Sequence, residues 1–575
     1  MSEHTEGRGR GTGQGGPGSA VRDHDDTAPL SRRSVLRNAL TASAATLLPS
    51  AIDLNVARTK AEGAIRGRDA PITFADVAAQ AEQRAASPYA PPPEALPPEL
   101  ANLSYDGYRA IAYRPAESLP LGRRFSAQLF HRGFLQRKRV DLFLQPRQGA
   151  PRALAYEARL FDLGPGLAGR SFPPDLGFAG FRLHYAFGDA SGPQEEFLVF
   201  LGASYFRLRG RGQEYGLSAR GAAIGTGAPG GEEFPDFVAH WICEPQPEAQ
   251  SLTVLSLLDS PSLSGAFRFE AEPGDPSRLR VTASLHPRKP IAQLGLAPLT
   301  SMFLHGQNGP GARDATAFDD FRPQVHDSDG LLVETPGDRL WRPLVNGRKG
   351  PQISAFRAEA LNGFGLLQRE RRFAAYLDVQ ARHEARPGLW VAQARPERQA
   401  SAEAVAGPRG FGPGAVQLFE IPSREEYMDN VVAAFVPREA AAPGRALALD
   451  YTLTTVGAEP APVLPGELAR VVSTRVGSAE RLRPTEPPSP ERRLYVIDFE
   501  GPGLPAQPEA DMAAEVSASA GRMIEPVVER VPQTGGWRLY VEWRPPAPMP
   551  PGDIVLRARL VRGNRPVSET WDAVA

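Results

Sequence analysis

The sequence has one cysteine among 575 residues and lacks several familiar catalytic motifs. A single cysteine, Cys243, excludes an intrachain disulfide and any metal site that uses several cysteines. Its flanks, Trp241-Ile242 and Glu244-Pro245, predict an ordinary strand end. No Gly-x-Ser-x-Gly elbow and no His-Glu-x-x-His pair occurs, which argues against serine-hydrolase and zinc-peptidase chemistry. We predict neither a metal nor a cofactor.

The sequence also has no excess of charge of either sign and no long hydrophobic run. Its 65 basic and 66 acidic residues nearly cancel, and the arginines are scattered. Nucleic acids and anionic membranes both select a basic surface, so neither is expected as the main partner. No segment reaches the roughly 18 consecutive apolar residues that a membrane-spanning helix needs. The mature protein is therefore expected not to span a membrane.

Glycine and proline, by contrast, are abundant. The 57 glycines and 58 prolines separate short apolar or alternating runs, which predict strands and few helices. With 41% hydrophobic residues, the chain has ample material for a core, but it is too long for a single one. We therefore predict an all-β protein with two or more domains. The clearest strand candidates are 125–130, 140–144, 181–185, 197–201, 252–258 and 279–285.

These patterns divide the body of the chain into two predicted domains. Residues 70–458 are expected to form a large antiparallel β-sandwich, with a short helix at 74–86. A proline-rich break at 456–465 precedes 466–575, whose four strand candidates fit a small immunoglobulin-like sandwich. Because the cysteine pair of true immunoglobulin domains is missing, this likeness concerns architecture only.

The beginning of the chain predicts an export signal. Residues 1–30 are glycine-rich, polar and charged, and we expect them to be disordered. A pair, Arg32-Arg33, precedes the modest apolar stretch 38–54, which makes 31–60 similar to a twin-arginine signal. The alternative is a chance pair before an amphipathic helix. Since this route carries folded proteins, we expect a protein that folds in the cytoplasm and works in the periplasm.

Within the segment 420–437, which begins with Glu420, three further carboxylates, Glu425, Glu426 and Asp429, cluster before an apolar run. In a helix or in a strand, Glu425 and Asp429 would fall on one side. Crowded like charges raise at least one carboxyl pKa, which is how a general acid stays protonated near neutral pH. The same residues also suit a solvated acidic turn before a core strand. The segment alone leaves both interpretations open.

Several stretches, taken in order, carry a resemblance to one family. They include Asp175-Leu-Gly-Phe-Ala-Gly-Phe-Arg182, Leu201-Gly-Ala-Ser-Tyr-Phe-Arg207, Tyr215-Gly-Leu-Ser-Ala-Arg-Gly221, Glu232-Glu-Phe-Pro-Asp-Phe237, His326-Asp-Ser-Asp329, Trp341-Arg-Pro-Leu344, the segment 420–437 and Ser568-Glu-Thr-Trp571. From about Ile72 to the C-terminus, the chain resembles the periplasmic glucans biosynthesis proteins of the G and D type. Its twin-arginine segment is more like that of the D-type member.

The resemblance implies a galactose-mutarotase-like β-sandwich with a long cleft, followed by a small immunoglobulin-like domain. It also implies a role in making or trimming osmoregulated periplasmic glucans, whose backbone is β-1,2-linked glucose, with a functional link to a membrane glucan synthase. A homodimer is left open. The D-type branch resembles inverting β-1,2-glucanases. On the matching positions, Asp429 would be the general acid, and Asp327 would be a distant base that acts through water.

The resemblance further indicates candidate glucan contacts. Trp341, Arg342, Arg386 and Trp390 lie in stretches similar to the cleft side of the family, where aromatic faces and arginines bind sugars. For each tryptophan the alternative is core packing. Glu426 either shapes the pKa of the acid, binds a sugar hydroxyl or is a charge on the rim.

Two departures from the family pattern concern the same region. His383 stands where the family usually has tyrosine, three residues before Arg386-Pro387, and we count it among the substrate contacts. The Phe-Gly-Pro-Gly at 411–414 stands where Trp-Gly-Lys-Gly is usual. Either change would alter a subsite or the proton path without changing the fold.

Other interpretations remain. The run 327–330, Asp-Ser-Asp-Gly, is similar to the start of a calcium loop, but 331–333 are apolar where further ligands belong, so we expect no metal. The neighbouring His326 either orients a carboxylate or satisfies a hydrogen bond in the core. The chain is alternatively a non-catalytic accessory that guides nascent glucan. A structural partner that docks through the C-terminal domain would have no glucan affinity.

Overall fold

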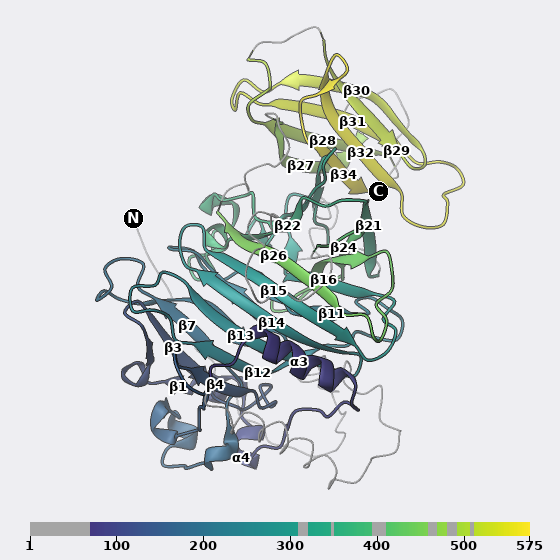
Figure 1. Cartoon of the computed structure of the whole chain (residues 1–575). Helices are drawn as coiled ribbons and strands as arrows, with labels where there is room; N and C mark the ends of the chain where they lie inside the picture. The colour runs from purple at the N-terminus through teal and green to yellow at the C-terminus, as the bar shows by residue number, and fades with distance from the viewer. Residues whose placement is uncertain are drawn as a thin grey trace, which may run out of the picture. The chain divides into compact units, whose positions relative to one another are not determined.

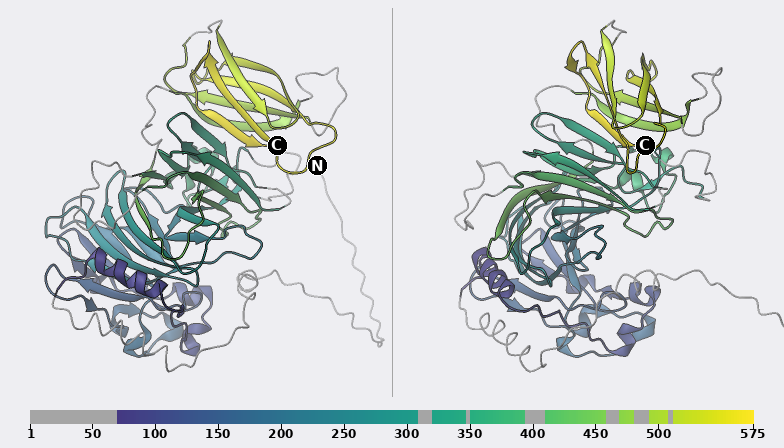
Figure 2. Two further views of the ribbon diagram at one scale, coloured as in Figure 1. Left: turned by 45° about the vertical axis from the view of Figure 1, so that its right-hand side comes forward. Right: turned by 90° about the vertical axis from the view of Figure 1, so that its right-hand side faces the viewer.

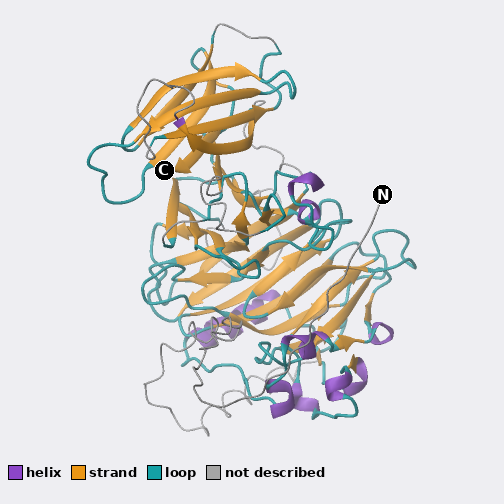
Figure 3. Cartoon of the chain, turned by 180° about the vertical axis from the view of Figure 1, so that it is seen from behind, coloured by secondary structure: helices purple, strands orange, loops and turns teal. Residues whose placement is uncertain are grey.

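The computed structural model describes residues 70–308, 320–346, 350–393, 410–457, 468–479, 492–506 and 511–575. The segment predicted to be disordered, the predicted export signal and most of the predicted break at 456–465 lie outside these residues. Strands dominate the described chain, as Figure 3 shows in orange. The predicted all-β fold is confirmed. None of the described helices is both long and apolar enough to cross a membrane.

The helices are few and short. The longest is α3 (Phe74–Ala85), which ends one residue before the predicted helix. Thr73 and Asp76 close its N-terminus as a capping box, because the side chain of each accepts a hydrogen bond from the backbone of the other. The apolar side of α3 packs against β13 and β14, the strands it crosses in Figures 1 and 2. The remaining helices are α4 (Pro98–Ala101), α5 (Tyr105–Arg109), and the 3-10 turns η1 (Pro115–Glu117), η2 (Ala158–Leu160), η3 (Pro165–Leu167), η4 (Pro174–Leu176), η6 (Phe373–Ala375) and η7 (His383–Ala385).

The described strands form two large sheets. The first contains β2 (Leu119–Leu121), β3 (Phe125–Phe130), β7 (Gly180–Tyr185), β8 (Glu195–Leu201), β9 (Tyr205–Leu208), β10 (Ser218–Arg220), β16 (Leu294–Ser301), β25 (Val431–Pro437), β24 (Gly414–Glu420) and β21 (Gln352–Ala358) in this order, with β11 (Ala222–Ile224) also paired to β16. Every pair in this sheet is antiparallel.

The second sheet is longer and contains two parallel pairs, β4 with β12 and β20 with β34. Its order is β29 (Met512–Ala518), β32 (Val555–Arg562), β34 (Thr570–Val574), β20 (Arg339–Pro343), β19 (Gly330–Glu334), β22 (Gly363–Leu367), β23 (Gly388–Gln393), β26 (Leu447–Val456), β15 (Arg278–Pro287), β14 (Leu263–Glu272), β13 (Leu252–Asp259), β12 (Asp236–Cys243), β4 (Asp141–Gln145) and β5 (Arg152–Ala153), with β33 (Arg565–Pro566) beside β32. The β20–β34 pair joins strands of both predicted domains, and the boundary between those domains stays a prediction.

Three smaller sheets complete the described strands. They are β1 (Ala112–Tyr113) with β6 (Phe161–Asp162), β17 (Phe303–His305) with β18 (Val325–His326), and a four-stranded sheet of β27 (Arg470–Ser478), β28 (Arg493–Glu500), β31 (Trp537–Arg544) and β30 (Arg522–Arg530). Of these, the short β17–β18 pair positions the candidate site, because Asp327, one of the predicted catalytic residues, directly follows β18.

A core rich in phenylalanine lies between the two large sheets. Phe200 and Phe206 of the first sheet each approach Phe269 of the second, with ring centroids 5.1 Å apart. Because strand side chains alternate between faces, the neighbours of Phe206 in β9, Tyr205 and Arg207, lie on the opposite face of the first sheet. That outer face of β9 is one wall of the candidate site described below.

Candidate functional site

The acidic segment forms the connection between two strands. Strand β24 ends at Glu420, β25 begins at Val431, and residues 421–430 form a loop. The loop is neither helix nor strand, so the periodicity that would place Glu425 and Asp429 on one side does not apply to it.

Asn430 fixes the end of this loop against the β17–β18 pair. Its side chain is buried, accepts a hydrogen bond from Phe303 N at 2.8 Å and donates one to Phe303 O at 3.0 Å. Phe303 is in turn the register partner of His326, the residue before Asp327. The sequence neighbours of the two predicted catalytic residues, Asn430 and His326, are therefore linked through Phe303, which brings Asp429 and Asp327 into one region.

Asp327 is a buried carboxylate with cationic partners. Arg386 donates a hydrogen bond to it, and His383 Nδ1 lies 3.6 Å from its Oδ1. Burial alone would raise the pKa of Asp327, but His383 and Arg386 outweigh burial, so the pKa lies below its ordinary value. Asp327 is thus held in its ionised form.

Glu426 belongs to a cluster centred on Arg322. The Arg322 guanidinium donates to Asp320 at 2.7 Å, to Asp378 at 2.9 Å and to Glu426 at 2.7 Å. Contact with His383 and the bonds from Arg322 lower the pKa of Glu426 to about 2. This Arg322 cluster joins three loops around the site, and it makes Glu426 a fixed anion.

Asp429 is in a different state from both of these carboxylates. Its side chain is exposed to solvent, and no other described residue forms a hydrogen bond or an ion pair with it. The protein around it removes enough solvation to raise its pKa, and the charge of Asp327 adds to this rise, while Arg207 and Arg220 oppose it. The site therefore contains one carboxyl shifted toward the protonated form and another, Asp327, shifted toward the ionised form.

The outer face of β9 and β10 provides an aromatic and cationic wall. The guanidinium of Arg220 lies between two rings, 5.3 Å from the centroid of Tyr205 and 5.4 Å from that of Phe234. Arg220 is buried and pairs with Glu232 at 2.6 Å, whereas Phe234 is 46% exposed. An exposed ring held in place by a buried cation is a preorganised flat surface. We call these residues (Tyr205, Arg220, Glu232 and Phe234) the Arg220 platform.

Three predicted glucan contacts have buried side chains. Trp341 and Trp390 are buried in a separate core, where Gly330 and Gly363 leave room for their rings. Arg342 is 1% exposed and pairs with Glu420 at 3.1 Å. Their side chains contribute to packing and to a buried ion pair, and their contact with glucan stays a prediction. The three C-terminal tryptophans, expected in the core, are buried: Trp537, Trp543 and Trp571.

His326 satisfies hydrogen bonds in the core. Its ring is buried, its nitrogens lie 2.8 Å from Gln368 Oε1 and 3.0 Å from Gln324 Oε1, and burial lowers its pKa to about 3. Of its two predicted roles, this is the one the contacts support. Cys243 ends β12, as predicted.

Among the described residues, one group has the spacing of metal ligands: Asp378, His383 and Glu426. Arg322 already forms hydrogen bonds with both of these carboxylates. A guanidinium therefore takes the place that a cation would need.

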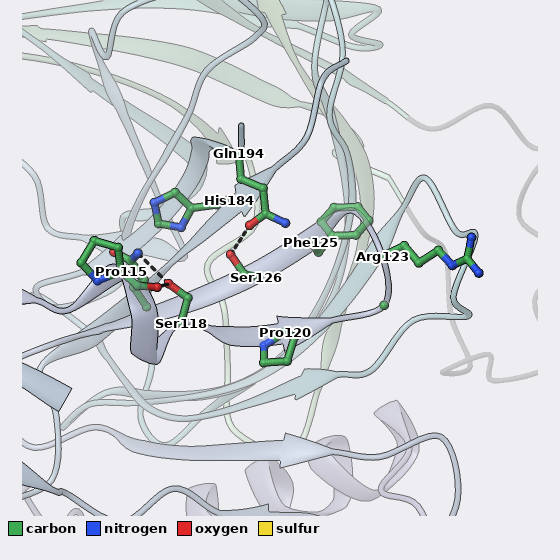
Figure 4. A pocket seen from close by; sticks show the side chains of 10 residues that line it. Pro115, Ser118, Pro120, Arg123, Phe125, Ser126, His184 and Gln194 are labelled. Atoms are coloured by element: carbon green, nitrogen blue, oxygen red, sulfur yellow. Dashed lines mark hydrogen bonds between the residues drawn. The ribbon is translucent and has the colours of Figure 1, made fainter. Parts of the chain in front are cut away.

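A cavity of about 420 Å³ lies farther along the first sheet (Figure 4). Ser126 and Gln194 point toward each other in it, and Gln128 donates to Ser118 at 2.9 Å. His184, the register partner of Ser126, also lines it. None of the predicted catalytic residues lines this cavity, but by the alternation of strand side chains its polar groups share the face of the sheet that carries Arg207.

Sequence reasoning missed the Arg220 platform and Arg322. The stretches 201–207, 215–221 and 232–237 were recognised as family-like, and the alternation in 204–208 separates Tyr205 and Arg207 from the core residues of β9. That alternation was the available signal for the platform. Arg322 lies in a connection without periodicity, so no local pattern marks it.

The fold and the site together define a class: an all-β sandwich with an open acidic site beside arginine and aromatic side chains. The family is shown by comparison. The family model described as "Periplasmic glucan biosynthesis protein, MdoG" matches residues 72–574, so the chain belongs to this family. The resemblance to the G and D type is thereby confirmed.

Individual relatives are similar in sequence to this protein over most of its length. "Glucans biosynthesis protein G" of Vibrio cholerae serotype O1 is 41% identical over 502 residues, which cover 85% of this chain and 84% of that protein. The protein of the same name from Shewanella frigidimarina is 42% identical over 498 residues, with 85% and 82% covered. That from Bradyrhizobium diazoefficiens is 38% identical over 550 residues, with 94% and 99% covered. All three carry the G-type name, whereas the likeness to the D-type member concerns the twin-arginine segment.

Proposed function

We propose that this protein sets the length of the β-1,2-glucose backbone during periplasmic glucan biosynthesis, as an inverting glycoside hydrolase. Asp429 is the general acid, and Asp327 is the base that activates water. The observation that carries the proposal is the opposite state of the two carboxyls. Asp429 has a raised pKa and no partner among the described residues, while Asp327 is held as an anion. Such a split is the usual sign of an acid–base pair.

Inversion assigns a different task to each carboxyl. Asp429 donates its proton to the glycosidic oxygen as the bond to the anomeric carbon breaks, and the leaving sugar departs as an alcohol. A water attacks the anomeric carbon from the opposite face, and its proton passes to Asp327 through further water. Exposure suits Asp429 for direct contact with the substrate. Burial suits Asp327 for a role at a distance.

The Arg220 platform supplies a surface for a sugar ring. The exposed face of Phe234 fits the apolar face of a pyranose, and the arginine behind it fixes the ring. The charges of Tyr205, Arg220 and Asp429 influence one another, which puts the platform near the acid. We assign Phe234 to a glucan subsite and Glu426 to hydrogen bonding with sugar hydroxyls at the rim.

The test is to incubate the purified protein with linear β-1,2-glucan and to measure chain length and anomeric configuration. Shorter chains with an inverted anomer are expected. Asp429→Asn should reduce cleavage by about 10²- to 10⁴-fold, the usual contribution of a positioned acid. Its thermal midpoint should not change, because the carboxyl is exposed. Undiminished cleavage by Asp429→Asn would refute the assignment of the acid.

A non-catalytic accessory is the second candidate, and the state of Asp327 favours it. A carboxylate that is stabilised by His383 and Arg386 is a weak base. Under this alternative the platform still binds glucan and guides nascent chains from a membrane synthase. Retained binding without any shortening would support the accessory role and overturn the hydrolase. Absence of both would leave the structural role, docking through 466–575. We further propose export through the twin-arginine route, which a fusion of residues 1–69 to a folded reporter would test.

A further inference from the structure

We propose that His383 is an imidazolium that bridges Asp327 and Glu426, and that loss of its proton opens this bridge. The bridge is independent of the reaction. The consequence of the bridge for catalysis rests on the proposed function, in which His383 would be a positioning residue between the base and the loop that carries the acid. Because the ring is fully buried, we assign His383 to positioning rather than to the substrate contact predicted from the sequence.

The geometry of the ring carries the proposal. Nδ1 of His383 lies 3.6 Å from Asp327 Oδ1, and Nε2 lies 3.7 Å from Glu426 Oε1. Neither nitrogen has a closer hydrogen-bond partner among the described residues. A neutral imidazole has one N–H and one lone pair, so either tautomer would direct a lone pair at a carboxylate. Only the doubly protonated ring suits both neighbours.

Both carboxylates are themselves held as anions, so neither supplies the missing proton. Arg386 donates to Asp327, and Arg322 donates to Glu426. Asp327 and Glu426 accordingly have lowered pKa values. A pair of fixed anions on two sides of one buried ring favours the imidazolium.

The remaining groups around the ring oppose one another. Burial disfavours the imidazolium, and so does Arg386. The carboxylate of Asp378 lies in one cluster with His383 and Glu426, and a negative charge there favours a cation. Tyr376 faces the ring with centroids 5.6 Å apart, and its pKa is raised so that the phenol stays neutral. His326 is neutral. Burial is the largest influence and lowers the pKa of His383, but contacts with the two carboxylates outweigh it, and the pKa is raised above 6.5.

The bridge joins three elements. His383 opens η7, Asp327 follows β18, and Glu426 lies in the β24–β25 loop that also carries Asp429. While the ring is charged, the base and the loop of the acid are held at a fixed distance. Because the folded pKa is raised, this stabilisation is complete below about pH 6.5, the unfolded value, and is lost as pH rises through the folded pKa.

Nitrogen NMR of the histidine rings of the full chain tests the bridge directly, without any glucan. We expect both ring nitrogens of His383 to be protonated at pH 6.5. As the ring loses one proton at higher pH, the signals of both nitrogens should shift over the same pH range. His383→Gln assigns the signals by their disappearance. His240, buried beside Ser256 with a pKa lowered to about 3, is the internal control and should remain a neutral tautomer throughout. A neutral tautomer of His383 at pH 6.5 would overturn the proposal.

Glu426→Gln gives a second measurement if His383→Gln fails to fold. It removes one of the two anions, so the pKa of His383 should fall, and His240 should not change. An unchanged titration of His383 in this variant would also overturn the bridge.

The consequence for catalysis has its own readout. Without the imidazolium, the pKa of Asp327 should rise, so the acidic limb of kcat/KM for β-1,2-glucan should move to higher pH in His383→Gln. A merely structural role would lower activity at every pH without moving that limb. If wild type cleaves no glucan, the hydrolase fails while the NMR result still decides the bridge.

Discussion

Two clusters of this protein each consist of an arginine with carboxylate partners, but they differ in how far solvent reaches the carboxylates. Arg369 lies 3.6 Å above the ring of Trp341, pairs with Glu569 at 2.6 and 3.1 Å, and donates to Val471 O at 2.7 Å. Glu569 also accepts from Val471 N at 2.7 Å, and its side chain is 0% exposed. The Arg322 cluster instead leaves Glu426 39% exposed.

The difference separates structure from function. In the Arg369 cluster a buried charge is enclosed by its partners, which is what a stable junction requires. In the Arg322 cluster the arginine holds three loops together, while solvent still reaches Glu426. Beside it lie the groups without hydrogen-bond partners among the described residues, Asp429 and the nitrogens of His383. A closed cluster would be expected to affect stability, and an open one binding.

The largest expected effect is on the closed cluster. Glu569→Gln removes the anion that pairs with buried Arg369 and should lower the free energy of unfolding by about 3–5 kcal/mol. Denaturant unfolding measures it. The matched control is Glu515→Gln, which removes an exposed pair with Arg559 and should cost less than about 1 kcal/mol. Equal effects of the two substitutions would show that the enclosed Arg369 cluster contributes no more to stability than an exposed ion pair does.

Arg322→Met should act more weakly on stability and more strongly on glucan. Three carboxylates lose their common donor, and we expect about 1–3 kcal/mol of destabilisation because solvent reaches part of the cluster. Glucan affinity, measured by calorimetry, should fall as the loops separate. Arg445→Met, which breaks an exposed pair with Glu439, is the control and should leave affinity unchanged. Unaltered affinity in Arg322→Met would show that the cluster does not shape the site.

Phe234→Ala should weaken glucan binding by about 5- to 10-fold, since an aromatic contact contributes about 1–1.5 kcal/mol. Phe234→Trp should retain binding, and the unfolding midpoint should not change. Met549→Ala removes an equally exposed apolar side chain from another region and is the control. Unchanged glucan affinity in Phe234→Ala would show that the Arg220 platform does not bind glucan.

The smallest expected effect is on the shape of the pH profile of cleavage rather than on the amount of activity. Cleavage should decline as pH rises through the raised pKa of Asp429, because the acid loses its proton. It should decline again as pH falls through the lowered pKa of Asp327, because the base becomes protonated. The pH dependence of kcat/KM measures both limbs, and the alkaline limb should be missing from the residual activity of Asp429→Asn. An alkaline limb that persists in Asp429→Asn would show that Asp429 is not the acid.

Much of the fold was predictable because β alternation is a local property. The strands at 125–130 and 252–258 were predicted within one residue of their bounds. In the candidate site, the resemblance predicted Asp327 and Asp429 as the catalytic pair, and the structure brings their segments together. The resemblance did not separate tryptophans that pack in the core from aromatic rings at the surface, because the exposure of Trp341 and Phe234 depends on residues distant in sequence that pack against them. Arg322 was missed because its role depends on contacts between three distant loops.

The parallel β20–β34 pair has a consequence for the order of folding. Arg342 of β20 pairs with Glu420 and lies 3.5 Å from Asp572 of β34, the last strand described. Until that strand emerges from the ribosome, a buried cation in the middle of the chain lacks one of its two anions. Contacts between residues so far apart in sequence form late and slowly. Chains that stop before residue 570 should therefore expose this charge and the edge of β20. Quality-control proteases should degrade such chains before they degrade full-length ones.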